Sequence, residues 1–130
     1  MVLAIRIHET GGPEKLRAEE IPVPAPAAAE VRFRVEAAGL NFIDTYKRSG
    51  LYPMPLPFTV GQEAAGVVTV VGTGVTEFHV DDRVATVSAS GAYAQEAIAS
   101  AAQLVRVPAG VTSQLAAAFS ADASYNWLDG

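Results

Sequence analysis

The chain has 130 residues, of which 50% are apolar and 18% are charged, and its formal net charge at pH 7 is −5. The apolar residues suffice for one core, and there is too little charge for a disordered chain. The acidic balance and the scattered Lys and Arg residues exclude a typical nucleic-acid-binding surface. The lack of cysteine excludes disulfides, thiolate zinc sites and a cysteine nucleophile.

The first third of the chain predicts short strands joined by turns. Residues 2–8 are β-rich, GGPEK supplies turn residues, and residues 16–21 predict the return strand of a hairpin. A proline-rich connector follows. In residues 30–38 apolar and charged side chains then alternate with period two, which predicts a half-buried strand with one solvent-exposed face.

Residues 41–49 predict a short helix. Asn41 is a favourable N-cap, Phe42, Ile43 and Tyr46 share one helical face, and Gly50 suits the C-terminal cap. The next segment, YPMPLPF, is a proline-stiffened loop that cannot be a central strand.

The rest of the chain predicts further short strands, and a helix is expected to begin with Thr112 or Ser113 as its N-cap. Many short strands separated by Gly, Pro and Asp turns favour a mainly β, barrel-like domain with little helix. The predicted strands in this part are residues 64–71, 83–87, 93–98 and 104–107.

Several motifs do not support the chemistry that they first suggest. VGTGV around Gly72 is followed by β-like residues rather than a helix, so it predicts a hairpin turn and not a dinucleotide site. His8 and His79 have no second ligand at metal spacing. The adjacent Asp81 and Asp82 indicate a solvated turn, and no G-x-S-x-G motif accompanies the serines.

The candidate site lies in residues 39–63, where polar and aromatic residues gather between two apolar runs. Tyrosine hydroxyls and an asparagine amide suit a carbonyl or quinone oxygen, which they can hydrogen-bond without a charge. The alternative is that the tyrosines only pack and that the aspartate satisfies local backbone groups. Spacing alone leaves both interpretations open. The residues concerned are Asn41, Asp44, Tyr46, Arg48 and Tyr52, followed by Gln62 and Glu63.

One family resemblance adds to this interpretation. AAGLNFIDTYKRSGLYP closely resembles the signature of zinc-independent quinone oxidoreductases, the zeta-crystallin-like branch of the medium-chain dehydrogenase/reductases. GGPEKL, GQEAAGVVTVVGTGVTEFHVDDRV and GAYAQEAIASAAQLVRVPAGV resemble further motifs of the family in the same order. The match covers about residues 1–119. It implies a GroES-like, partly open β-barrel with short helices, which forms the substrate domain of an NADPH-dependent reductase.

The resemblance also implies that no zinc is bound. Zinc-dependent relatives carry a cysteine near the position of Asn41 and a histidine where this chain has Gln62. The cysteine-rich lobe that holds their structural zinc is missing as well.

By similarity to the family, Tyr46 and Tyr52 contact or polarise the acceptor oxygen, and Asn41 positions the nicotinamide-ribose end of NADPH. The acceptor is a quinone or an enone, and the hydride comes from the cofactor. Asp44 would orient its neighbours, and Arg48 would balance charge. The residues that we expect to complete the cleft are Asp44, Arg48, Gln62 and Glu63.

The sequence departs from the family at two places. Asp81 stands where the family usually has glycine, which we expect to change only a turn. Residues 120–130, SADASYNWLDG, form an atypical tail where the family continues into a helix and a Rossmann domain, so we expect the isolated chain to lack that domain and to be inactive.

Two alternatives to the reductase domain remain open from the sequence. The main alternative is a non-enzymatic GroES-like module that binds a partner or assembles with itself. The second is the enoyl-reductase part of a polyketide-type enzyme, from which NFIDTY and GLYP point away. We expect a homo-oligomer or a separate cofactor domain as partner. No apolar run approaches the roughly 18 residues of a membrane span, and MVLAIRIHETGG does not resemble a signal peptide, so we expect a cytoplasmic protein without a membrane partner.

Overall fold

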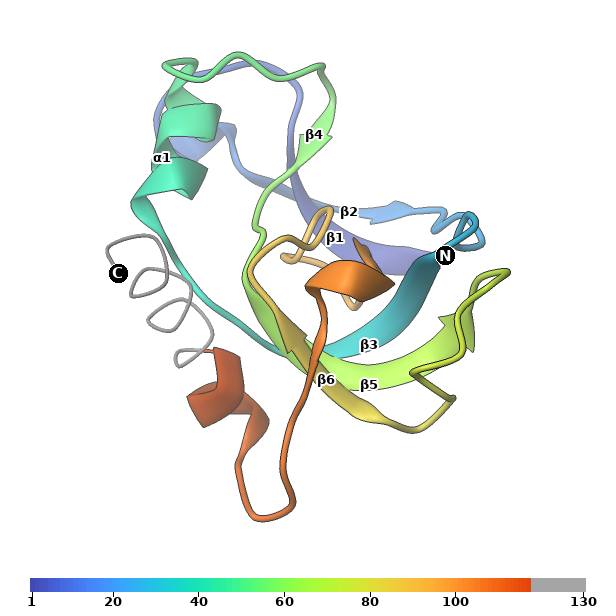
Figure 1. Ribbon diagram of the computed structural model, residues 1–130. Coiled ribbons are helices and arrows are strands. Elements are labelled where there is room, and N and C mark those ends of the chain that lie inside the picture. Colours follow the sequence, from blue (N-terminus) through green and yellow to red (C-terminus); the bar gives the residue numbers. More distant parts are fainter. Residues whose placement is uncertain (118–130) are drawn as a thin grey trace.

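Two antiparallel sheets make up most of the computed structural model, which describes residues 1–117 (Figure 1). One sheet has the strand order β2-β1-β4 and the other has the order β7-β3-β5-β6-β8. The strands are β1 (Val2–Ile7), β2 (Arg17–Ile21), β3 (Glu30–Ala38), β4 (Phe58–Thr59), β5 (Ala64–Val71), β6 (Arg83–Thr86), β7 (Glu96–Ser100) and β8 (Val105–Arg106). The short helices are η1 (Pro13–Lys15), α1 (Phe42–Ser49) and η2 (Ala101–Gln103). The prediction of a mainly β fold with little helix is confirmed.

The main core lies on one face of the larger sheet. The alternation in β3 places Val31 and Phe33 inward, and neither side chain is exposed to solvent. On the neighbouring strand β5, Val68 pairs with Phe33 and is also fully buried. Each such side chain stabilises the fold by about 1.5–3 kcal/mol relative to an exposed one. The packed sheet therefore fixes the position of the residues that follow β3.

The pairing of β3 with β5 is irregular near this end. The register shifts between Val35 and Ala37, opposite Gly66. A Cβ added at Gly66 would collide with the backbone carbonyl of Arg34. Glycine is therefore required for the close approach of the two strands at this bulge.

The smaller sheet is attached to the larger one through Tyr93. The Tyr93 amide donates to the Val60 carbonyl (2.9 Å), and its own carbonyl accepts from the Ile5 amide (2.7 Å). The predicted strand 93–98 is therefore wrong at its start, because Tyr93 and Gln95 pair with the smaller sheet and β7 begins only at Glu96. Strand β4, at the edge of the smaller sheet, was not predicted.

Both ends of α1 follow the predicted capping chemistry. Asn41 has the extended backbone of an N-cap, and Gly50 ends the helix in the left-handed conformation (φ 93°). The next predicted helix begins at Ser113, where the Thr112 hydroxyl accepts a hydrogen bond from the Leu115 amide (3.1 Å). Of the two predicted caps, Thr112 is correct.

Two turns contain a residue with a left-handed backbone, Gly74 in one and Asp81 in the other. Gly74 (φ 83°) lies in the connection from β5 towards β6, and no helix opens after it, as the hairpin interpretation of VGTGV predicted. Asp81 has φ 76°, a left-handed conformation that costs a non-glycine residue more than glycine. The glycine that the family resemblance led us to expect at this position would suit that backbone conformation.

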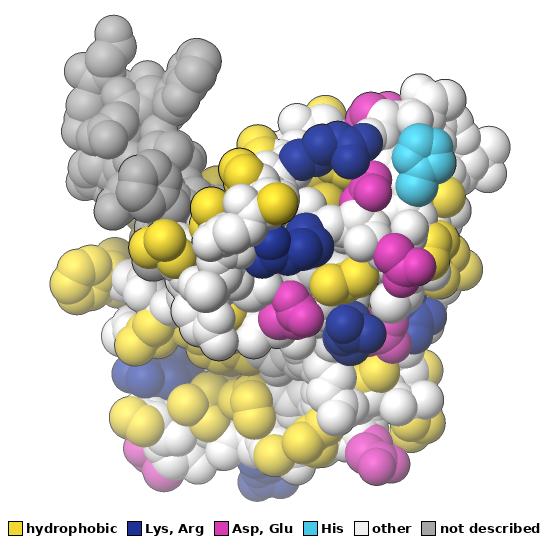
Figure 2. All heavy atoms as spheres, turned by 90° about the horizontal axis from the view of Figure 1, so that it is seen from below, with side chains coloured by type: hydrophobic (Ala, Val, Ile, Leu, Met, Phe, Trp, Pro, Cys, Tyr) yellow, Lys and Arg dark blue, Asp and Glu magenta, His cyan; other side chains and the backbone are white. Residues whose placement is uncertain are grey.

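Charged side chains of both signs are interspersed on the face shown in Figure 2, and among the described residues visible there no patch of one sign covers it. No helix within residues 1–117 combines the length and apolarity needed to cross a membrane. The predicted tail, residues 120–130, and the end of the predicted domain at residue 119 lie outside the described residues.

Candidate active site

A buried polar cluster lies where β3 ends and α1 begins. The Asn41 side-chain amide donates to a Glu63 carboxylate oxygen (2.6 Å), and Glu63 is only 3% exposed. The Gly39 amide donates to the Glu63 backbone carbonyl (2.9 Å). A Cβ at Gly39 would collide with the Glu63 carboxylate. The glycine therefore lets this carboxylate lie directly against the chain that leads into the helix.

Asp44, in the first turn of α1, is the buried residue of this helix, with 3% exposure. The Asp44 carboxylate accepts hydrogen bonds from the backbone amide of Asn41 (3.0 Å) and from the Tyr93 hydroxyl (3.2 Å). A negative charge is stabilised at this end of a helix by the unpaired amides of the first turn. Asp44 thus fixes the start of α1, where Asn41 is placed.

Tyr93 is a member of the cluster that the sequence analysis missed. Its hydroxyl lies 3.1 Å from the Gly39 carbonyl and 3.2 Å from the Asp44 carboxylate, so its one proton can be donated to either oxygen. Burial raises the pKa of the Tyr93 hydroxyl strongly, and the Asp44 carboxylate raises it further. The phenol therefore stays protonated and acts as a fixed donor. Tyr93 lies in the GAYAQ motif, which supported a strand and the family resemblance but was not assigned a site residue.

The two predicted catalytic tyrosines lie together at the surface. The ring centroids of Tyr46 and Tyr52 are 6.0 Å apart, and the residues are 38% and 52% exposed. The Tyr52 amide donates to the Tyr46 carbonyl (3.2 Å), which ties the loop back onto α1. Neither hydroxyl bonds to another of the described residues. Both phenols are therefore open to an external oxygen atom.

The remaining predicted residues have other partners. The Arg48 guanidinium donates to the Gly11 carbonyl (3.2 Å), so it attaches α1 to the first hairpin. Gln62 accepts a hydrogen bond from the Lys47 ammonium (3.1 Å). Lys47, which the sequence analysis did not select, also lies 5.8 Å from the centre of the Phe58 ring. Nothing in its local sequence distinguishes it from a solvent-exposed helical lysine.

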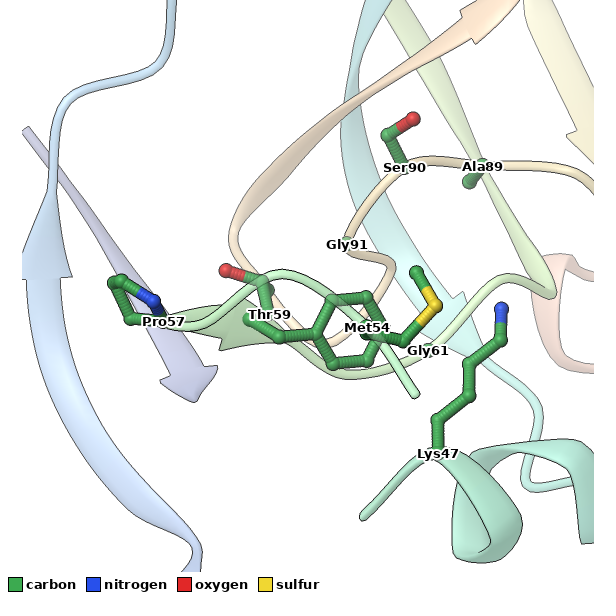
Figure 3. A pocket seen from close by; sticks show the side chains of 9 residues that line it. Lys47, Met54, Pro57, Thr59, Gly61, Ala89, Ser90 and Gly91 are labelled. Atoms are coloured by element: carbon green, nitrogen blue, oxygen red, sulfur yellow. The ribbon is translucent and has the colours of Figure 1, made fainter. Parts of the chain in front are cut away.

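An open pocket of about 330 Å³ lies between α1, β4 and the loop before β7 (Figure 3). Neither Tyr46 nor Tyr52 lines it. The pocket is connected to the buried cluster through Lys47, whose partner Gln62 immediately precedes Glu63. Its lining residues are Lys47, Met54, Pro57, Phe58, Thr59, Gly61, Ala89, Ser90 and Gly91.

The described residues offer little to a metal ion. Within residues 1–117 no three His, Cys, Asp or Glu side chains are grouped to hold one. His8 lies 2.7 Å from a Glu19 carboxylate oxygen, and His79 is near Asp82, so the two histidines contact different carboxylates. The site therefore consists of amides, phenols, two buried carboxylates and a lysine.

The described residues form a small antiparallel β domain in which amide and phenol side chains lie on a short helix and on the chain segments beside it.

The chain belongs to the family of the alcohol dehydrogenase GroES-like domain, which matches residues 27–109. It is 47% identical over 114 residues to the 2-haloacrylate reductase of Burkholderia sp, covering 83% of this chain. It is 45% identical over 120 residues to quinone oxidoreductase 1 of Escherichia coli K12, covering 91% of this chain. The crystal structure of Escherichia coli quinone oxidoreductase complexed with NADPH matches with a TM-score of 0.86 and 44% identity, over 89% of this chain and 36% of that one.

The chain spans 34% and 37% of the lengths of these two curated relatives. The prediction of a GroES-like domain, similar to that of quinone oxidoreductases of the medium-chain dehydrogenase/reductase family, is confirmed. The roles of the individual residues and the independence from zinc remain predictions.

Proposed function

We propose that residues 1–117 form the substrate-binding part of a zinc-free, NADPH-dependent reductase of quinones or enones. We also propose that the 130-residue chain is inactive by itself. The observation that carries the proposal is the pair of open phenols, Tyr46 and Tyr52, beside the rigid cluster around Asp44. When bound, NADPH supplies a hydride from its nicotinamide ring.

Tyr46 and Tyr52 hold the acceptor. Their hydroxyls donate hydrogen bonds to its oxygen, and they stabilise the negative charge that develops there during reduction. Their rings, 6.0 Å apart and tilted by 38°, offer apolar contact to a flat molecule. This combination suits a quinone or an enone.

The cluster positions the reacting groups. The Asn41 side-chain nitrogen donates to Glu63, and the Asn41 side-chain oxygen faces the Asp44 backbone amide in the capping box of α1. A carbonyl oxygen has a second lone pair, which fits the amide or a ribose hydroxyl at the nicotinamide end of the cofactor. The phosphates have no such fit within residues 1–117, since the Gly72–Gly74 turn leads towards β6 instead of opening a helix. A cofactor domain outside these residues would have to hold them.

The side chains at the two family zinc positions support the metal-free reaction. Asn41 and Gln62 are amides, which are poor ligands for zinc compared with thiolate and imidazole. Both are already engaged, Asn41 with Glu63 and Gln62 with Lys47. The phenols would take over the stabilisation of the oxyanion that a metal provides elsewhere.

A chimera tests this function. Residues 1–117 would replace the matching segment of Escherichia coli quinone oxidoreductase 1, and oxidation of NADPH by 1,4-benzoquinone would be followed with and without a chelator. We expect activity that the chelator leaves unchanged. Replacing both tyrosines, Tyr46→Phe with Tyr52→Phe, should lower kcat/KM by about 100-fold, as loss of oxyanion donors does. Complete loss of activity on chelation would contradict the metal-free proposal.

A second candidate function is a non-enzymatic binding module. Three large apolar side chains at the two ends of α1 are strongly exposed, and such a surface is typical of contact with another protein. They are Leu40 (79%), Phe42 (80%) and Leu51 (68%). Sedimentation of the 130-residue chain and a fluorescence titration with NADPH separate the two candidates. Saturable micromolar binding of NADPH by this chain would argue against the binding module.

A further inference from the structure

A half-buried lysine extends from α1 into the pocket, towards Met54 and Gly61 (Figure 3). The Lys47 ammonium lies 3.1 Å from the Gln62 amide oxygen and 5.8 Å from the centre of the Phe58 ring. Both partners are uncharged. Within residues 1–117 no carboxylate lies within ion-pair distance of this ammonium. Residues 1–117 therefore hold the Lys47 cation in place without giving it an ion-pair partner.

The only other lysine in the sequence has a different environment. Lys15 forms an ion pair with Glu9 at the surface, away from the pocket. Contact with an aromatic face stabilises a cation such as Lys47, and an ammonium has three protons to donate, of which Gln62 takes one. Lys47 can therefore bind an anion in the pocket without first breaking an ion pair to any of residues 1–117.

The other pocket residues suit an organic anion of low charge. The volume of the pocket, about 330 Å³, is near the lower end of the range for small-molecule sites. Met54, Pro57 and Phe58 supply apolar contact, and Thr59 and Ser90 add two hydroxyls. Lys47 is the one cationic side chain that lines the pocket, and the chain as a whole has a net charge of −5. The pocket therefore favours a ligand with a single negative charge over a multiply charged phosphate.

We propose that this pocket, called the Lys47 pocket below, binds the carboxylate of a small α,β-unsaturated acid, with the Lys47 ammonium as the anion-binding group. The proposal rests on the proposed function for one step, namely that the bound acid is an electron acceptor. Its carboxylate pairs with Lys47, whereas the oxygen of a quinone or enone pairs with Tyr46 and Tyr52, which do not line this pocket. Reduction of the bound acid breaks the C=C π bond, with a hydride from the reduced nicotinamide added at the β carbon and a proton from water added at the α carbon. Pairing with Lys47 offsets the negative charge of the carboxylate, which otherwise makes the β carbon less electrophilic.

Binding can be measured directly on the 130-residue chain, labelled with nitrogen-15. Crotonate would be titrated at constant ionic strength while the amide signals of Gly61 and Gly91, which line the pocket, are followed. We expect saturable shifts of both signals. Lys47→Met should weaken binding by about tenfold or more, the effect of losing a charge-assisted hydrogen bond. Lys15→Met removes the same charge elsewhere and should leave the affinity unchanged.

Two further ligands distinguish a carboxylate site from a purely apolar pocket and from a general anion site. Crotonamide has the same shape without the charge, and inorganic phosphate has charge without the apolar body. Both should bind at least about tenfold more weakly than crotonate to the unmodified chain. Equal affinity for crotonamide, equal or higher affinity for phosphate, or unchanged affinity in Lys47→Met would each overturn the proposal. The comparison of ligands needs no variant, so it decides the matter even if Lys47→Met fails to fold.

The crotonate titration and the chimera assay fail independently. Crotonate binding without quinone reduction by the chimera would contradict the proposed function alone. Quinone reduction without crotonate binding would contradict the carboxylate proposal alone.

Discussion

The larger sheet and the α1 region follow opposite rules of burial. In β3 the apolar side chains of Val31 and Phe33 are buried and Arg34 is exposed. In α1 the buried side chain is the carboxylate of Asp44, while Phe42 is 80% exposed. The sheet gains stability from apolar burial, whereas the helix is fixed by hydrogen bonds that use up its polar groups. Its apolar and phenolic surface is thereby left for a ligand or a partner.

The contrast also separates stability from function. Substitutions in the sheet should change the free energy of unfolding through sterics and apolar contacts. Substitutions in the cluster should change it through unsatisfied hydrogen bonds, and they should disturb the placement of Asn41 at the same time. Four substitutions in the 130-residue chain make this comparison quantitative.

The largest effect is expected for Gly66→Ala in the sheet. The new methyl group would collide with the Arg34 carbonyl, which backbone pairing holds in place. We therefore expect the free energy of unfolding, measured with urea, to fall by about 4 kcal/mol. Gly74→Ala is the control, since no atom lies within 4 Å of its added Cβ and only its left-handed backbone opposes the change. A loss of about 1 kcal/mol is expected there. Equal losses for the two variants would show that sterics at the bulge are unimportant.

Asp44→Ala should have the next largest effect. It leaves the Asn41 backbone amide without its buried acceptor and leaves the Tyr93 hydroxyl with the Gly39 carbonyl alone, and we expect the free energy of unfolding to fall by about 3 kcal/mol in the same measurement. Asp44→Asn retains the shape and one acceptor oxygen, so it should cost less. If Asp44→Ala were neutral, the cluster would not fix the start of α1.

Tyr93→Phe removes one hydroxyl and retains the ring, so the expected loss at neutral pH is about 1.5 kcal/mol. Because the pKa of Tyr93 is raised in the folded state, its contribution is complete below its unfolded pKa of about 10 and is lost as the pH rises from there towards the folded value. The original chain should therefore lose stability more steeply above that pH than the variant does. Parallel stability curves at alkaline pH would refute this assignment.

The smallest effect, and the opposite sign, is expected for Asp81→Gly. Glycine adopts the left-handed backbone found there (φ 76°) with less strain. We therefore expect the free energy of unfolding to rise by about 0.5–1 kcal/mol, which urea unfolding would measure as a higher midpoint. Asp82→Gly is the control, because the Asp82 carboxylate bonds to the His79 amide (2.9 Å) and to Arg106 (3.0 Å). That variant should be destabilised.

The parts of the fold that local chemistry determines could be predicted from the sequence. Period-two alternation located β3, and the Asn41 and Gly50 caps located α1, because both signals arise within a few residues. The start of β7 was predicted incorrectly since the Tyr93 amide bonds to the carbonyl of Val60, which lies between β4 and β5. No local pattern contains that information.

The same limit applies to the candidate site. Asn41 and Asp44 were selected by their position in a recognisable motif, and their mutual contact is local. Tyr93 reaches Asp44 across 49 residues of sequence, and Arg48 reaches Gly11 across 37. Such long-range partners depend on how the sheets meet, so they were found only from the structure.

Tyr93 has a consequence for how this domain can change. Its backbone joins the two sheets, and its phenol supports Asp44, so one residue carries both the architecture and the alignment of the site. An inserted or deleted residue before it would shift both together. Natural or engineered diversity in ligand preference is therefore expected to accumulate around the rim, at positions such as Met54 and Ser90, rather than at this junction.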